Sequence, residues 1–365
     1  MNIILLSCAL NYRTLAGLSA RHKVHYLIPR EDMKQMEVEF KELDRLSDVH
    51  RKNLRLYPLG RLYVLNAFKK ALTLVRREGI DLFLTTSPLL GLLCLFFRIF
   101  FKKPYAIFVG QSFTGIILAE RPFYQKVLLP FYKILMFVSF RSADVIITHS
   151  RYMRAYVKRY GGRNVVGVYY YGVDTEAFRP MRTGRRGKFT VMYAGRFSLE
   201  KGVEQLLEAF KILKHEGFVF RVLMCGQGPL KDVIAKDMKD SHIDLELYGY
   251  VDQKTLAVKI NQADVFVVPS ISEGLGFIAA EALSCGIPVI ASSVGGLPDS
   301  VGGYGILVPP GNPKALADAI MNVYSNYCHF KKKALEGRKH IIEKFERRKV
   351  VREFNDALKS VVKER

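Results

Sequence analysis

Short, continuous apolar runs alternate along this chain with segments of helical periodicity, and in the C-terminal half most of the runs lead into glycine. In the C-terminal half, apolar runs at 188–193, 220–225, 245–247 and 264–269 alternate with helical patterns at 203–216, from 230 and at 255–261. Comparable runs occur in the N-terminal half, at 3–7, 24–28, 82–85, 105–109 and 145–148. Short β-branched runs are typical of strands covered on both faces of a parallel sheet. The alternation predicts two facing, doubly wound α/β domains, with ligands between them at the carboxyl ends of the strands.

A stretch rich in turn formers and charge divides the chain. Residues 172–188 read GVDTEAFRPMRTGRRGK and have no apolar periodicity, which indicates a linker. A length of 365 residues with 49% hydrophobic residues also fits two domains better than one. We place the N-terminal domain at residues 1–175 and the C-terminal domain at 176–345.

The net charge of +22 is concentrated in the N-terminal part of the chain. Residues 1–180 carry 28 Lys and Arg against 13 Asp and Glu, and residues 181–365 carry 28 against 21. A basic surface attracts nucleic acid, anionic lipid or a phosphorylated substrate, and charge alone does not decide among them. The five cysteines show no metal-ligand spacing and the N-terminus has no basic region typical of a signal peptide, so we expect a cytoplasmic protein with reduced thiols.

Two apolar segments in the basic half suggest a membrane surface. They are 88–103, PLLGLLCLFFRIFFKK, and 131–141, FYKILMFVSFR, and both interleave aromatic with basic residues. Neither has an apolar stretch long enough to span a bilayer. Each is either a buried helix of the α/β domain or a helix that lies in the membrane interface, and the second alternative predicts peripheral binding to the cytoplasmic face of the membrane.

The segment 265–292 carries the clearest chemistry. It predicts a buried strand, a glycine-bearing loop, a helix and a second buried strand. The loop contains Glu273 and the helix contains Glu281. Amides at the start of a helix that follows a strand bind anions, and carboxylates hold hydroxyl groups. The segment therefore predicts a site for a phosphorylated sugar.

With the motifs that precede and follow this segment, the chain resembles the GT-B glycosyltransferases of the large retaining family 4 (group 1). The resemblance covers nearly all of the C-terminal half. It is carried, in order, by Gly195-Arg196-Phe197 with Lys201-Gly202, Gly226-Gln227-Gly228-Pro229-Leu230, Gly249-Tyr250-Val251, Ala263-Asp264-Val265, 269–282, Gly286-Ile287-Pro288-Val289, Gly295-Gly296-Leu297-Pro298-Asp299 and 305–309. It implies two Rossmann-like domains with an interdomain cleft, and a last helix, about 346–365, that packs back on the N-terminal domain.

The resemblance also implies roles for individual residues. Arg196 and Lys201 resemble the pair that binds the nucleotide diphosphate and stabilises the charge that develops on it. Glu273 resembles the carboxylate beside the donor sugar, and Glu281 the one that binds the ribose hydroxyls. The remaining donor-binding positions are Gly195, Gly226, Gly274, Leu275, Gly276 and Phe277, with Tyr250 and Val251 near the nucleobase. Arg196, Lys201 and Glu273 are the expected catalytic residues.

The implied reaction is transfer of a sugar from a UDP- or GDP-linked donor to an acceptor hydroxyl with retention of configuration. The chain contains no D-x-D motif, and the cations of Arg196 and Lys201 can take the place of a metal on the diphosphate. We expect neither a metal nor another cofactor.

The acceptor side departs from the family pattern, because the first loop lacks the usual glycine pair and Gly110-Gln111-Ser112 stands where many relatives have a histidine. We assign Gly17, Ser87, Gln111 and His149 to this side. Three functions remain open: transfer to a lipid-linked or phospholipid acceptor at the membrane in glycan, glycolipid or cell-envelope polysaccharide synthesis; the same chemistry on a soluble acceptor; and non-catalytic binding of nucleic acid. No recognisable nucleic-acid module supports the third function.

Overall fold

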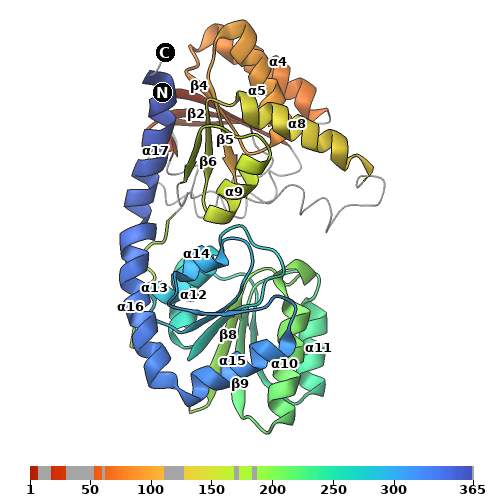
Figure 1. Ribbon diagram of the computed structural model, residues 1–365, viewed down its shortest axis with the longest axis vertical. Coiled ribbons are helices and arrows are strands. Elements are labelled where there is room, and N and C mark those ends of the chain that lie inside the picture. Colours follow the sequence, from red (N-terminus) through yellow and green to blue (C-terminus); the bar gives the residue numbers. More distant parts are fainter. Residues whose placement is uncertain are drawn as a thin grey trace. The chain divides into compact units, whose positions relative to one another are not determined.

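The computed structural model describes residues 1–6, 18–29, 53–59, 62–110, 127–167, 172–182 and 187–363. The chain forms two compact units, Met1–Tyr171 with Val350–Arg365, and Gly172–Lys349 (Figure 1). The boundary expected at residues 175 and 176 lies slightly downstream of the first of these divisions.

The N-terminal unit contains a parallel sheet in the order β3-β2-β1-β4-β5-β6-β7. Its central strands are buried along their whole length because helices cover both faces. The strands are β1 (Asn2–Leu6), β2 (Lys23–Pro29), β3 (Leu54–Leu59), β4 (Leu82–Thr85), β5 (Tyr105–Val109), β6 (Val145–Thr148) and β7 (Val165–Gly167).

Four helices pack through one core cluster on one face of this sheet: α4 (Tyr63–Arg77), α5 (Pro88–Phe101), α8 (Leu129–Ser142) and α9 (Arg151–Arg159). The other face is covered in part by α17 (Arg347–Lys363). Buried side chains of α17 recur at Val350, Phe354, Leu358 and Val361, which is the spacing of one helix face.

The C-terminal unit contains a parallel sheet in the order β10-β9-β8-β11-β12-β13. The strands are β8 (Phe189–Ala194), β9 (Phe220–Cys225), β10 (Asp244–Tyr248), β11 (Val265–Val268), β12 (Val289–Ser292) and β13 (Ile306–Val308). The chain starts at β8, builds outward to β10, and then returns to the other side of β8 with β11. The point between β8 and β11, where the strand order reverses, is where open α/β sheets bind ligands.

Helices cover both faces of this second sheet as well. One core cluster joins it to α10 (Val203–His215), α11 (Lys231–Asp240) and α15 (Pro313–Ser325). On the other face, α13 (Phe277–Ser284) packs against β11 and β12, and α16 (Tyr327–Phe345) packs against α13. The shorter helical elements are the 3-10 turn η1 (Leu199–Lys201), α12 (Gln253–Asn261) and α14 (Leu297–Val301).

The predicted pair of Rossmann-like, parallel-sheet domains is confirmed. The two apolar segments at 88–103 and 131–141 fall on α5 and α8. Within the described parts of the chain, every helix is too short or too polar to cross a bilayer.

Candidate functional site

The loops that follow β8 and β11 bring the predicted diphosphate-binding and sugar-binding residues together. β8 and β11 pair directly in the sheet, so their carboxyl ends lie side by side. Arg196 and Lys201 follow β8, and Glu273 follows β11. Residues more than 70 positions apart in the sequence thus meet at the point where the strand order reverses.

Lys201 and Glu273 form an ion pair. Lys201 Nζ donates a hydrogen bond of 2.9 Å to Glu273 Oε2, and the two side chains are 27% and 16% exposed. Ser270 Oγ donates to the same carboxylate oxygen at 3.2 Å. The Lys201 ammonium and the Glu273 carboxylate are therefore in direct contact, and both remain accessible to solvent. Ser270 was missed as a site residue, although its position directly after the strand-ending Pro269 was a signal.

Two glycines allow the backbones of these loops to approach closely. A Cβ on Gly202 would lie 1.9 Å from the carbonyl oxygen of Pro269, and a Cβ on Gly295 would lie 1.7 Å from that of Glu273. The Ile271 amide also donates to the Glu200 carbonyl at 2.9 Å. The two glycine contacts and this hydrogen bond hold the loops together. They thereby fix the backbone positions near Lys201 and Glu273.

Helix α13 begins beside this pair. Gly276 precedes the helix with φ 79 and ψ 57, a left-handed conformation, and α13 has no side-chain cap. A helix N-terminus carries a partial positive charge and presents backbone amides, so the residues predicted to cradle phosphate, Leu275 to Phe277, are placed where an anion is favoured. Gly274 follows Glu273, and its amide donates to Glu273 Oε1 at 3.3 Å.

Glu281 lies within α13 and is only 5% exposed. It is four residues beyond Phe277, roughly 6 Å along the helix axis. Burial, together with the negative charge of Glu281, raises the pKa of the Cys285 thiol to about 12. Glu281 is thus less exposed to solvent than Glu273.

Arg196 is the most exposed of the predicted catalytic side chains. Its side chain is 63% exposed and its nearest acidic neighbour is Glu200, at 3.7 Å. A pair this exposed and this long contributes little, so the guanidinium is free to turn towards another anion. The backbone is held, since Tyr193 Oη donates to the Arg196 carbonyl at 2.7 Å. Burial raises the pKa of Tyr193, and the carboxylates of Glu273 and Glu200 raise it further.

The other predicted donor residues lie along the same edge of the sheet. The amide of Gly195 donates to the Cys225 carbonyl at 3.0 Å, and a Cβ on Gly226 would lie 1.9 Å from the Gly195 carbonyl oxygen. Tyr250 and Val251 follow β10, the edge strand, and Tyr250 is 59% exposed. The last two are therefore two strands away from Arg196.

On the acceptor side, the structure places two of the four predicted residues at the carboxyl edge of the N-terminal sheet. Ser87 follows β4 and precedes α5, and its amide donates to Thr85 Oγ1 at 3.2 Å. His149 follows β6, is 7% exposed, and its ring meets Phe108 edge-on at 5.7 Å. Gly17 and Gln111 lie outside the described residues.

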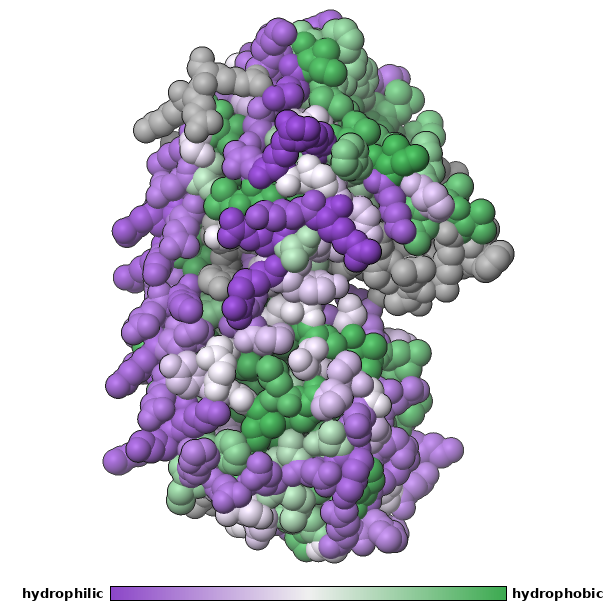
Figure 2. Space-filling view, in the orientation of Figure 1, coloured by the Kyte–Doolittle hydropathy of each residue, from purple (hydrophilic) through white to green (hydrophobic). Residues whose placement is uncertain are grey.

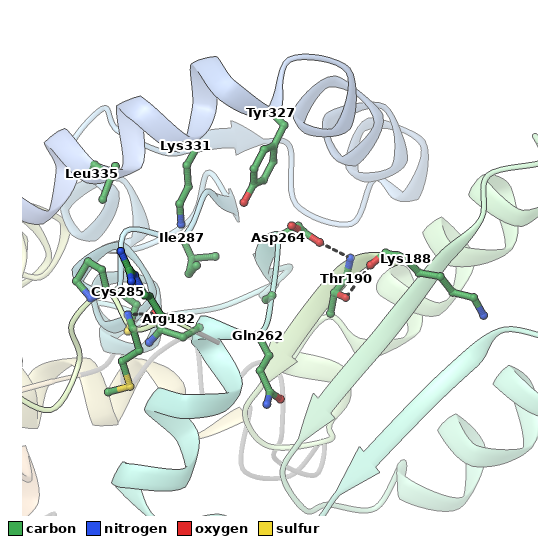
Figure 3. Close-up of a pocket in the computed structure, with 14 residues that line it drawn as sticks. Arg182, Lys188, Thr190, Gln262, Asp264, Cys285, Ile287, Tyr327, Lys331 and Leu335 are labelled. Carbon is green, nitrogen blue, oxygen red and sulfur yellow. Dashed lines mark hydrogen bonds between the residues drawn. The ribbon is translucent and has the colours of Figure 1, made fainter. Parts of the chain in front are cut away.

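A cavity of about 300 Å³ lies elsewhere in the C-terminal unit (Figure 3). Its lining includes Asp264 and Ile287, which precede β11 and β12, so it lies at the amino edge of the sheet, opposite to the candidate site. Lys331 Nζ donates to the Gly286 carbonyl at 2.7 Å, and Lys188 pairs with Asp244 at 2.9 Å. These interactions stabilise the amino edge of the sheet and the helix beside it. The cavity is not part of the candidate site.

No group of three or more His, Cys, Asp or Glu side chains within the described ranges is arranged to hold a metal ion. Metal independence itself remains a prediction.

Comparison with known proteins agrees with this geometry. The sequence profile "Glycosyl transferases group 1" matches residues 174–347, and the profile "Glycosyltransferase Family 4" matches residues 10–177. The D-inositol 3-phosphate glycosyltransferase of Paenarthrobacter aurescens is 34% identical over 174 residues, a match that spans 42% of this chain and 42% of that protein. The matched region is thus less than half of that relative's length.

Among solved structures, sucrose-phosphate synthase from Thermosynechococcus elongatus superposes with a TM-score of 0.81 at 20% identity, covering 100% of both chains. Anabaena HepE in complex with UDP gives 0.78 at 16% identity, covering 99% of this chain and 100% of the other. At these identities the likeness establishes the fold, whereas the two profiles together account for most of the sequence. The chain belongs to the group 1, family 4-like glycosyltransferases and has their GT-B fold.

Proposed function

We propose that this protein is a retaining glycosyltransferase that moves a sugar from a UDP- or GDP-linked donor to a hydroxyl group of a lipid-linked or phospholipid acceptor. The reaction takes place at the cytoplasmic face of a membrane, in glycan, glycolipid or cell-envelope polysaccharide synthesis. The observation that carries the donor half is the Lys201–Glu273 pair, 2.9 Å apart, at the point where the order of the C-terminal strands reverses.

The donor roles follow from the chemistry of these groups. When the bond between the sugar and the diphosphate breaks, its electron pair goes to the phosphate oxygen, and Lys201 and Arg196 stabilise the negative charge that develops there. Glu273 holds the donor sugar, and Glu281, further along α13, binds the ribose hydroxyls. The new bond forms between the anomeric carbon and the acceptor oxygen, on the face that the diphosphate leaves, and the acceptor proton passes to the departing phosphate.

The acceptor half is supported by the N-terminal unit. Ser87 and His149 lie at the carboxyl edge of its sheet, and several large apolar side chains on its helices are exposed. A lipid-borne acceptor suits such a surface better than a fully hydrated one does.

Calorimetry with UDP and with GDP tests the donor half. We expect saturable binding of one of them, and we expect Glu281→Ala to abolish it, while Glu204→Ala, an exposed glutamate on α10, leaves it unchanged. Absence of binding to either nucleotide would remove the proposal and favour a non-catalytic role.

Two further measurements test the chemistry. NMR of the product, formed from a donor of known anomeric configuration, should show the same configuration; inversion would refute a retaining mechanism. EDTA should leave transfer intact, and loss of transfer that magnesium or manganese restores would refute metal independence.

The same chemistry on a soluble acceptor is the second candidate. The name of the P. aurescens relative, which specifies an inositol phosphate, favours it. Screening lipid-linked and water-soluble acceptors with a radiolabelled donor distinguishes the two.

A further inference from the structure

Helix α8 is apolar on two opposite faces. Met136, with Phe140 one turn later, is fully buried in the core of the N-terminal unit. On the other face, Phe131 and Ile134 are each 60% exposed and Phe137 is 50% exposed. A helix that is apolar all round is normally surrounded by other apolar groups. Among the described residues, only one face of α8 is so surrounded, and the side chains of the outer face are exposed.

The neighbouring helices continue this exposed surface. Near the end of α5, Ile99 and Phe100 are 55% and 67% exposed. The start of α4 borders an open groove with an almost wholly apolar lining: Leu62, Tyr63, Val64, Leu65, Phe68 and Leu93. The three helices are adjacent, because α5 packs on α8 and Phe68 of α4 contacts the Phe96 ring of α5 at 5.0 Å. Figure 2 shows hydrophobic side chains, in green, gathered over this part of the unit.

The charged residues within the four helices of this face have a single sign. The helices α4, α5, α8 and α9 carry four, one, two and four Lys or Arg residues, and none of the four helices carries an Asp or Glu. By contrast, α10 and α11 of the C-terminal unit carry both signs. Of the carboxylates that adjoin the four helices, Glu78 is paired with Lys23 and Asp144 with Arg98.

Exposed apolar side chains together with positive charge indicate which kind of partner binds this surface. Two copies of the chain docked face to face would bring like charges together, which is unfavourable. An anionic bilayer instead offers a hydrocarbon boundary for the aromatic side chains and phosphate groups for the lysines and arginines. We propose that the outer faces of α4, α5 and α8 dock on an anionic lipid bilayer, with Phe100, Phe131, Ile134 and Phe137 entering the interface. The inference deepens, and rests on, the proposed function at a membrane acceptor.

The docking surface lies close to the acceptor side within the same unit. Helix α5 starts at Pro88, three residues after the end of β4, and therefore at the carboxyl edge of the sheet, where Ser87 and His149 lie. Leu89, in the first turn of α5, is 44% exposed and stands two residues from Ser87. Docking that includes this first turn of α5 therefore brings that edge near the lipid headgroups.

Flotation of the full-length protein with vesicles tests the proposal. The wild type should bind phosphatidylglycerol vesicles at about 50 mM salt, bind phosphatidylcholine vesicles poorly, and detach as the salt concentration rises towards about 0.5 M. The double variant Phe131→Ser, Phe137→Ser should bind at least about tenfold more weakly, because two large apolar side chains no longer enter the interface. The variant Lys133→Glu, Arg141→Glu should lose at least about fivefold for each residue.

The control is Val219→Ser, Val233→Ser, which removes apolar side chains that are 67% and 48% exposed on the C-terminal unit and should bind as the wild type does. All variants alter exposed positions, and circular dichroism with the thermal unfolding midpoint checks that they are folded. The proposal is overturned if the wild type does not float with phosphatidylglycerol vesicles, or if the Phe131 and Phe137 variant floats equally well. It is also overturned if light scattering shows that the wild type is a dimer and that this variant is a monomer. Vesicle binding without nucleotide binding would instead refute the donor half of the proposed function and leave this surface standing.

Discussion

Replacing Glu273 by glutamine should have opposite effects on the binding of the nucleoside diphosphate and on sugar transfer. The substitution keeps the size of the side chain and removes its charge. In the structure the Glu273 carboxylate accepts a hydrogen bond of 2.9 Å from the Lys201 ammonium. A diphosphate that binds Lys201 must therefore compete with this carboxylate. Glutamine ends the competition and also deprives the donor sugar of its carboxylate.

The magnitude follows from the burial of the pair. At this distance the Coulomb attraction is several kcal/mol for an effective dielectric constant of about 20, but both side chains reach solvent, being 27% and 16% exposed. Desolvation and screening reduce the net value of such pairs to about 1 kcal/mol. We therefore expect UDP or GDP to bind about fivefold more tightly to Glu273→Gln. Transfer should fall by about a hundredfold or more, the usual effect of removing one preorganised electrostatic contact from a transition state.

Calorimetry with the nucleoside diphosphate and a steady-state transfer assay measure the two effects. Glu208→Gln is the matched control, because Glu208 also pairs with a lysine at 2.9 Å but on the surface of α10, and it should change neither quantity. Unchanged or weaker diphosphate binding by Glu273→Gln would refute the competition between Glu273 and the diphosphate. Unchanged transfer would refute the role of Glu273 beside the sugar.

Three further predictions concern stability. Arg338 donates hydrogen bonds to three backbone carbonyls at 2.6–3.2 Å, so Arg338→Met should lower the free energy of unfolding by about 2–4 kcal/mol in urea titrations, and a loss below about 0.5 kcal/mol would contradict this. Gly202 and Gly217 have φ of 70 and 77, but only a Cβ on Gly202 would clash, with the Pro269 carbonyl. Gly202→Ala should therefore destabilise the protein more than Gly217→Ala and also weaken nucleotide binding; equal effects would refute this reading of the loop contact. Burial lowers the pKa of His25, so the folded state binds fewer protons than the unfolded state, and the free energy of unfolding should fall as pH drops from about 7 to 5. His25→Phe should flatten this dependence, and an unchanged slope would show that His25 does not contribute.

The strands and helices that carry the candidate donor site could be predicted from the sequence because each of them is local. Each strand, glycine turn and helix of the C-terminal half lies in one contiguous stretch, and the predicted order of strand, glycine-bearing loop and helix is found at β11, Gly276 and α13. The meeting of Lys201 with Glu273 depends on β8 pairing with β11, which no local pattern encodes. The resemblance to the family assigned both residues to the donor site but predicted neither their ion pair nor the hydrogen bond from Ser270.

The N-terminal half was less readable, for identifiable reasons. Strand β3 was not expected, because its sequence, LRLYPL, mixes an arginine and a proline into an edge strand that pairs only with β2. The packing of α17 was expected from resemblance alone. An apolar stripe from Val350 to Val361 makes this packing possible. The stripe alone does not reveal its partner, because the sheet that it contacts lies more than 180 residues earlier in the chain.

The sequence left two possible environments open for the apolar segments 88–103 and 131–141, and the structure shows that one helix can have both a buried and an exposed apolar face. The pattern offered a choice between buried helices and helices in a membrane interface, as if each segment had one environment. In the structure, α8 buries Met136 and Phe140 in the core and exposes Phe131 and Phe137. A helix with two apolar faces needs two apolar surroundings, and folding of this unit provides only one of them within the described residues. The excess positive charge of the N-terminal half, carried in part by four helices without a single carboxylate, gives the reason to expect an anionic bilayer as the second.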